Sequence, residues 1–94
     1  MKKKKVVVTT GKRGVFFGEL VSGDIATGLC KLINAQMCIY WSAETNGVLG
    51  LASHGPQVGS KVTPVIPAIE LNDVTAIMDC SDEAVKQWAS QILS

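Results

Sequence analysis

The sequence contains few residues that could carry out chemistry. Its 94 residues include one histidine, one arginine and three cysteines, and none of the cysteines forms a Cys-x-x-Cys pair. An odd number of cysteines at these spacings fits neither a disulfide framework nor a zinc site. Buried free thiols in a reducing compartment are therefore expected. We predict no catalytic residue, no metal and no cofactor, and so a protein that is not an enzyme.

Long apolar runs are also missing. No run approaches the roughly 18 residues that a membrane-spanning helix needs. The run Val6–Val8 is too short for the apolar region of a secretory signal. We therefore expect a cytoplasmic protein.

The chain has no large excess of charge of either sign. Nine basic residues face eight acidic ones, and four of the nine are Lys2 to Lys5. The rest of the chain is slightly acidic, which argues against a protein that coats nucleic acid through many phosphate contacts. The length suits one domain, 1–94, with a basic tail over residues 1–5.

The first half of the chain is rich in strand-forming residues. Val6–Thr10 and Val15–Val21 predict two strands joined by the turn Gly11–Gly14. Gly18, inside the second strand, indicates a bend or the close approach of another backbone. A sharply bent strand is typical of a small barrel.

Further strands are expected after this pair. Leu29–Ile33 and Met37–Trp41 predict strands three and four, separated by residues 34–36. The Asn46-Gly47 pair predicts a hairpin that leads into a strand over Val48–Ala52. Residues 53–67 are rich in glycine and proline and predict an ordered, functional loop.

The end of the chain changes character. Ile69–Leu71 and Val74–Met78 predict a short final strand or a strand pair, which completes a β-barrel over residues 6–80. Residues 81–94 predict a helix with Ser81 as its N-cap and Trp88 on its apolar face. The fold class is therefore mostly β: a small, strongly bent antiparallel sheet or barrel with one C-terminal α-helix.

The candidate ligand-binding residues combine cations, hydroxyls and aromatic rings. A glycine-rich turn can present backbone N–H groups and cations to phosphate, although an ordinary solvated hairpin has the same pattern. Adjacent aromatic residues on a strand offer a face on which a base could stack, unless one ring is buried and the other lies at a subunit contact. The lone histidine follows a serine, but neighbours in sequence seldom form a catalytic pair. The candidates are Lys12, Arg13, Tyr40, Trp41, His54, Ser60 and Lys61.

Adjacent aromatic pairs also suggest self-association. Because neighbouring strand residues face opposite sides, one of Phe16 and Phe17 should point outward, as should one of Tyr40 and Trp41. A homo-oligomer would cover such exposed apolar area.

Two resemblances follow from these segments. Residues 6–24, with Leu32–Ala35 and Asn72–Ile77, resemble an Sm-like barrel, which implies a small bent barrel able to form a ring. Over most of its length the chain resembles small uncharacterised proteins encoded by bacteriophages and prophages, which implies a viral origin and a place in the host cytoplasm. The segments that carry this second resemblance are Arg13–Gly18, Ile39–Trp41, Gly50–Pro56, Asp73–Ala76 and Trp88.

Three functions remain open at this point. The first is a phage accessory protein whose homo-oligomer sequesters small phosphate-bearing ligands, such as host immune nucleotide signals. The second is an Sm-like ring that binds RNA, which the acidic body disfavours. The third is an interaction protein that inhibits a host enzyme or joins the virion through residues 53–67 and the Trp88 helix.

Overall fold

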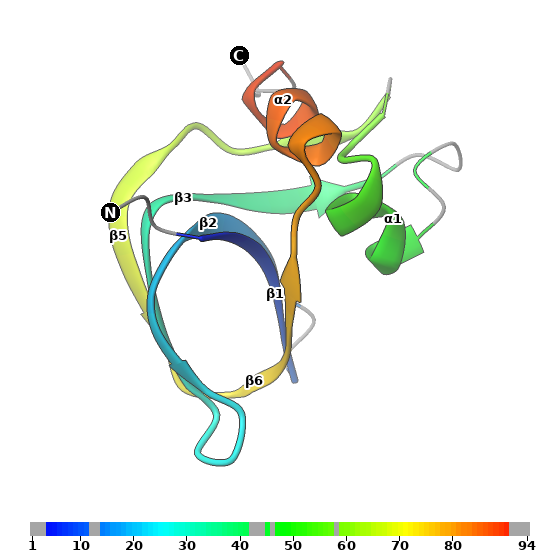
Figure 1. Ribbon diagram of the computed structural model, residues 1–94. Coiled ribbons are helices and arrows are strands. Elements are labelled where there is room, and N and C mark those ends of the chain that lie inside the picture. The colour runs from blue at the N-terminus through cyan, green and yellow to red at the C-terminus, as the bar shows by residue number, and fades with distance from the viewer. Residues whose placement is uncertain (1–3, 12–13, 42–44, 46, 58, 91–94) are drawn as a thin grey trace.

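A strongly curved antiparallel sheet forms the centre of the protein (Figure 1). The computed structural model describes residues 4–11, 14–41, 45, 47–57 and 59–90. The elements are β1 (Lys5–Thr10), β2 (Val15–Asp24), β3 (Leu29–Tyr40), α1 (Gly47–Ser53), β4 (Lys61–Val62), β5 (Ile66–Leu71), β6 (Val74–Asp79) and α2 (Asp82–Ser90).

The strands follow the order β6–β1–β2–β3, and the long β3 pairs along its other side with two further strands. β5 pairs with its first half and β4 with its last residues. Within the described residues β4 and β5 form one edge of the sheet and β6 the other, and the two edges do not pair, so hydrogen bonds do not close the sheet into a barrel. The predicted class, a mostly β fold with a bent antiparallel sheet and a C-terminal helix, is confirmed.

β3 is one bent strand, whereas the sequence predicted two strands separated by residues 34–36. The bend lies at Asn34, whose φ of 49° is one that asparagine tolerates better than most residues. The Asn34 side-chain amide donates to the Glu19 carboxylate at 2.7 Å, and the register with β2 shifts here. Opposite the bend lies Gly18, where a Cβ would lie 3.1 Å from the Ile33 carbonyl oxygen. The expected close approach of another backbone at Gly18 is confirmed.

Two hydrophobic cores lie on opposite faces of the sheet. β1 contributes to both, because Val7 points to one face while Val6 and Val8 point to the other. The outer core lies beneath the helices and contains Val7, Val15, Phe17, Cys38, Leu51, Ala52, Val62, Ala84 and Trp88. The inner core is enclosed by the curving strands and contains Val6, Val8, Cys30, Leu32, Ala35 and Val74.

The double-sided burial also covers both phenylalanines. Phe17 is buried in the outer core, and Phe16 packs against the inner core. The two rings lie on opposite faces of the sheet, as predicted, but the outward-facing Phe17 is covered by Trp88 of α2 and so is not left exposed.

Residues 47–53 form the helix α1, and the predicted hairpin and strand over Val48–Ala52 are wrong. Leu51 and Ala52 are buried in the outer core. Seven residues are too few for a helix that is stable by itself in water, so packing must hold it.

That packing comes from α2, which satisfies the last carbonyls of α1. The Ser81 N–H donates to the Ala52 carbonyl at 2.9 Å, and the Ser81 hydroxyl donates to the Ser53 carbonyl at 2.6 Å. The Trp88 indole N–H donates to the Leu51 carbonyl at 3.0 Å. Helix ends leave such carbonyls without intrahelical partners, so α1 depends on α2 for its C-terminus.

The ends of the predicted segments also differ from the structure. Residues 53–67, predicted as a loop, contain β4 and the start of β5, because buried Val62 anchors β4 in the outer core. Of the predicted tail, the Lys4 ammonium pairs with Asp79 at 3.6 Å, and Lys5 begins β1. The predicted N-cap Ser81 is confirmed, since its hydroxyl accepts from the Ala84 N–H at 3.0 Å. Residues 1–3 and 91–94 lie outside the described part of the chain.

Candidate functional site

Tyr40 and Lys61 lie directly opposite each other where β3 ends and β4 begins. The chain after β4 is fixed to β3 by Thr63, whose N–H donates to the Met37 carbonyl at 2.9 Å. In return the Met37 N–H donates to the Thr63 hydroxyl, also at 2.9 Å. These bonds hold the strands that carry Tyr40 and Lys61 side by side. We call this pair of a cation and an aromatic ring the Tyr40–Lys61 site.

A small hollow of about 240 Å³ adjoins Tyr40, and the described residues that line it are Ile39, Tyr40 and Trp41. Tyr40 is 56% exposed and Ile39 54% exposed, whereas Trp41 packs partly against the outer core. The expectation that one of the two adjacent rings points outward is confirmed, and the exposed ring is Tyr40. Tyr40 therefore presents a face that a planar ligand can reach.

Ser60 precedes Lys61 and is held by a buried threonine. The hydroxyls of Ser60 and Thr45 lie 3.3 Å apart, and Thr45 Oγ1 also accepts from the Gln57 N–H at 3.0 Å. Thr45 is fully buried, so this contact fixes the backbone immediately before Lys61.

His54 belongs to a different part of the surface. It follows α1, and its Nδ1 lies 3.6 Å from a carboxylate oxygen of Glu83 in the first turn of α2. Gly55, with a φ of 81°, packs so tightly against α2 that a Cβ would lie 2.8 Å from the Ala84 carbonyl oxygen. The geometry gives His54 a role in the α1–α2 contact rather than one beside the exposed tyrosine.

Lys12 and Arg13, predicted to hold phosphate, lie outside the described residues. The residues that flank them form a turn in which Thr10 and Gly14 exchange backbone and side-chain hydrogen bonds. The Gly11 N–H donates to the Asp73 carbonyl at 2.9 Å.

The three thiols are free, and burial raises the pKa of each. Desolvation by burial raises the pKa of Cys38 to about 11, against the lowering effect of a hydrogen bond with the Tyr40 backbone. Desolvation and the nearby Asp79 carboxylate raise the pKa of Cys80 to about 12. A thiol held protonated is a poor nucleophile and a poor metal ligand.

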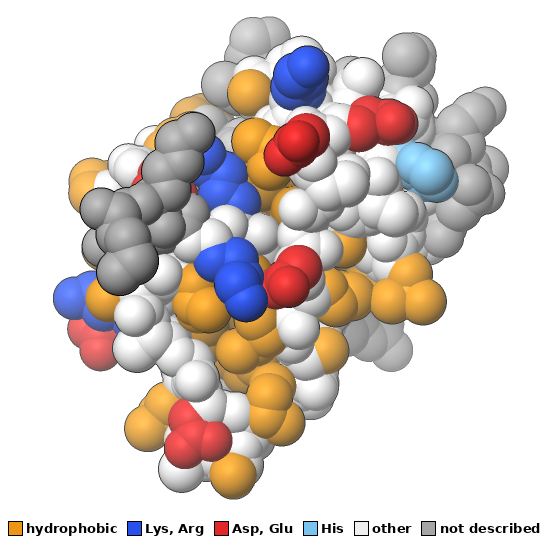
Figure 2. Space-filling view, viewed as in Figure 1, with side chains coloured by type: hydrophobic (Ala, Val, Ile, Leu, Met, Phe, Trp, Pro, Cys, Tyr) orange, Lys and Arg blue, Asp and Glu red, His pale blue; other side chains and the backbone are white. Residues whose placement is uncertain are grey.

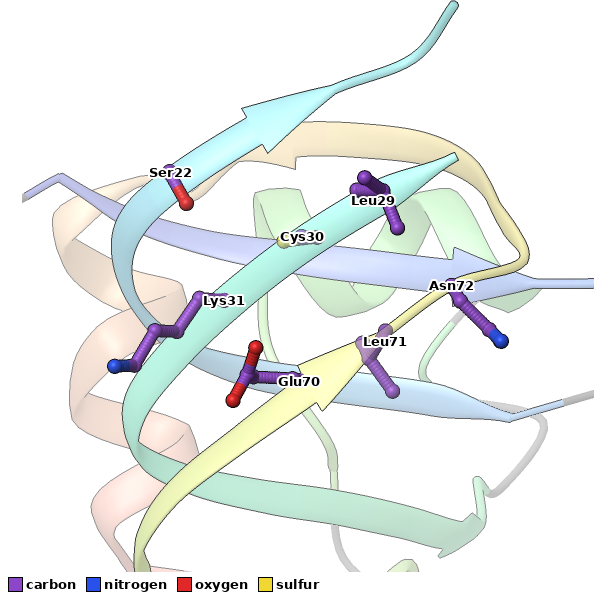
Figure 3. Close-up of a pocket in the computed structure, with 7 residues that line it drawn as sticks. All are labelled: Ser22, Leu29, Cys30, Lys31, Glu70, Leu71 and Asn72. Atoms are coloured by element: carbon purple, nitrogen blue, oxygen red, sulfur yellow. The ribbon is translucent and has the colours of Figure 1, made fainter. Parts of the chain in front are cut away.

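A second and larger hollow, which sequence reasoning missed, lies at the far end of β3 (Figure 3). Its volume is about 520 Å³, and it spans β2, β3 and β5. The sequence signals this hollow only through the alternation of polar and apolar residues in β3 and β5. That alternation shows which side chains lie together only once the register of the two strands is known. We call it the Lys31 groove, and it is lined by Ser22, Leu29, Cys30, Lys31, Glu70, Leu71 and Asn72.

Two further classes of feature were searched for in the described part of the chain. It contains no group of three or more histidine, cysteine, aspartate or glutamate residues that could hold a metal ion. Neither α1 nor α2 is long and apolar enough to cross a membrane.

The chain matches a known family of protein domains. A family model described as a domain of unknown function, DUF6948, matches residues 3–88. Comparison with curated proteins gives no match.

Proposed function

The chain belongs to the DUF6948 family, whose function is unknown, and from its site we propose that it is a non-enzymatic binding protein. Its ligand is a small molecule that carries an aromatic ring and a phosphate, the chemistry of a nucleotide. The observation that carries the proposal is the placement of exposed Tyr40, which lines a hollow, directly opposite exposed Lys61. A base stacked on an aromatic side chain gains about 1–3 kcal/mol, and a lysine ammonium is a common partner of phosphate.

The reactive groups of the described chain support binding rather than turnover. Cys38 and Cys80 have raised pKa values, about 11 and about 12, and so carry little thiolate near neutral pH. The lone histidine, His54, contacts the Glu83 carboxylate of α2. No nucleophile paired with a base is therefore found around the Tyr40–Lys61 site in the described residues.

The charge distribution supports a small ligand more than a coat of RNA. On the face shown in Figure 2, lysines are interspersed with acidic side chains rather than gathered into one basic surface. Binding of a nucleic-acid backbone relies on many basic contacts, whereas one nucleotide needs few.

We also propose that copies associate and that the site lies near their contact. The exposed apolar side chain of Ile39 lies beside Tyr40 on β3, and exposed Ile66, which follows exposed Val65, lies on β5 opposite Ala35 of the same strand. With the resemblance to phage-encoded proteins, this supports an accessory protein that sequesters host nucleotide signals. The same apolar side chains favour a second candidate, a protein inhibitor of a host enzyme. Recovery of one specific partner from host lysate, with no nucleotide affinity, would select that second function.

Calorimetry against a panel of cyclic and linear nucleotides tests the first function. We expect one class to bind the wild-type protein, and Tyr40→Ala and Lys61→Gln each to weaken it about tenfold or more. Lys86→Gln on α2 is the matched control, since it removes an exposed lysine far along the chain from β3 and β4. Absence of heat for every nucleotide at about millimolar concentration, or equal losses in all three variants, would contradict the proposal.

A further inference from the structure

The Lys31 groove places complementary polar groups in one row across three strands. Ser22 of β2 lies opposite Lys31 of β3, and Lys31 lies opposite Glu70 of β5. Side chains directly opposite each other on antiparallel strands share a face and lie about 4.5–5.5 Å apart at Cβ. A hydroxyl, an ammonium and a carboxylate therefore line one end of the groove, as Figure 3 shows.

Both charges of this row are available to a ligand. Among the described residues the ion pairs are Lys4 with Asp79 and His54 with Glu83, and neither Lys31 nor Glu70 takes part in one. The side chains of Lys31 and Glu70 are both exposed, and neither takes part in a side-chain hydrogen bond with another described residue. The groove thus offers one positive and one negative charge side by side, with no net charge.

The other end of the groove is apolar with a single amide. Leu29 is 55% exposed and lies two residues before Lys31, on the same face of β3, whereas the Leu71 side chain packs against the inner core. Asn72 follows Leu71, and all three side chains lie away from the charged end in Figure 3. The volume of about 520 Å³ falls within the range of about 300–1,000 Å³ that is typical of small-molecule sites.

We propose that the Lys31 groove binds a small zwitterion with an apolar side chain, that is, a free amino acid or a short peptide. Lys31 and the Ser22 hydroxyl hold the ligand's carboxylate, and Glu70 holds its ammonium. The ligand's apolar side chain lies against Leu29, which shares a face of β3 with Lys31, and the Asn72 amide is placed for a peptide group. A nucleotide is a poor occupant, because Glu70 would repel its phosphates.

This site is separate from the Tyr40–Lys61 site and does not depend on it. The groove lies along the first residues of β3, whereas Tyr40 is the last residue of that strand. The two sites can therefore be tested independently by titrations on the same protein.

Titration of ¹⁵N-labelled protein with leucyl-leucine, followed by NMR, tests the proposal. We expect the backbone signals of Lys31, Glu70 and Asn72 to shift and those of Tyr40 and Lys61 to stay in place. Acetylation of the peptide's amino group, or amidation of its carboxylate, should each weaken binding about tenfold or more, because each removes a charge-assisted contact. No shift up to about 10 mM peptide, or equal affinity for the capped peptides, would overturn the proposal.

Charge variants separate recognition from a general effect on folding. Lys31→Gln should remove the preference for a free carboxylate, and Glu70→Gln the preference for a free ammonium. The double variant Lys31→Glu with Glu70→Lys should recover binding that either single reversal loses, since the groove again presents both charges. Lys86→Gln is the control and should bind as the wild-type protein does. If the double variant binds the peptide no more tightly than either single reversal does, the roles assigned to Lys31 and Glu70 are contradicted.

Discussion

Trp88 stacks face to face on Phe17, with ring centroids 4.9 Å apart and ring planes 8° from parallel. The contact joins α2 to β2 across the outer core, and Trp88 is fully buried. Its indole N–H also donates to the Leu51 carbonyl at 3.0 Å, so one side chain links two helices and the sheet.

Replacing Trp88 by alanine should be the most damaging single change in the outer core. We expect Trp88→Ala to lower the free energy of unfolding by about 3–5 kcal/mol, measured by urea denaturation. Trp88→Phe should retain the stack and cost less, mainly the hydrogen bond to Leu51 and the lost volume. Tyr40→Ala is the control, because Tyr40 is 56% exposed. A cost for Trp88→Ala as small as that for Tyr40→Ala would show that the stack is not a main support.

Ser81 should be more important for stability than a typical serine at the start of a helix. Its hydroxyl accepts from the Ala84 N–H and donates to the Ser53 carbonyl, so Ser81→Ala removes a bond from each helix. We expect a loss of about 1–2 kcal/mol in chemical denaturation. Ser81→Asp retains an acceptor for Ala84 and lacks the donor for Ser53, so it should recover part of the loss. Ser90→Ala, which removes only a contact to Gln87 in the same helix, is the matched control.

Gly18 should tolerate no larger residue. A Cβ there would lie 3.1 Å from the Leu32 Cβ and 3.3 Å from the Ala35 Cα, in the crowded bend of β3. We expect Gly18→Ala to destabilise the protein by about 1–3 kcal/mol, as overpacking does. Gly11→Ala is the control, because its nearest contact, the Asp73 carbonyl oxygen, would be 3.9 Å away. Equal melting temperatures for the two variants would contradict the crowding at β3.

The thiols should be unreactive in the folded protein and should weaken it at high pH. Burial raises the pKa of Cys38 to about 11 and of Cys80 to about 12, above the value of about 8.5 for an exposed thiol. The unfolded chain therefore loses its thiol protons first, so stability is unaffected below about pH 8.5 and falls as the pH rises toward these folded values. Alkylation by iodoacetamide at pH 8 should be slow until urea is added. The double variant Cys38→Ala with Cys80→Ala is the comparison for the loss of stability at high pH. An identical pH profile in that variant would exclude Cys38 and Cys80 as its cause.

Features of the fold that depend on local sequence were predictable. The β-branched run that became β1, the crowded glycine at position 18 and the Ser81 cap each follow from a residue's own geometry or from its near neighbours. The apolar face that carries Trp88 was also visible as a helical period.

Features that depend on distant partners were not predictable. Residues 47–53 are short and apolar, a pattern that fits a buried strand as well as a helix. The helix α1 is stabilised by hydrogen bonds that Ser81 and Trp88, far along the chain, donate to its last carbonyls. The continuity of β3 likewise depends on the contact of Asn34 with Glu19 on the neighbouring strand.

The candidate sites divide in the same way. The sequence indicated Tyr40, Trp41, Ser60 and Lys61 as chemical types, while the pairing of Tyr40 with Lys61 required the register of β3 and β4. The Lys31 groove went unnoticed because its charged residues look like ordinary solvated positions until β5 is placed beside β3. The Lys31 groove is separate from Tyr40 because the two lie at opposite ends of β3, a strand of 12 residues.

The donors that complete α1 have a consequence for how the protein is made. A chain emerging from the ribosome presents residues 47–53 well before Ser81 and Trp88. Until those two residues arrive, the three last carbonyls of the helix must be satisfied by water, and the apolar face of β2 that bears Phe17 stays bare. The nascent protein is therefore expected to remain protease-sensitive and prone to stick to its neighbours until synthesis has passed residue 88.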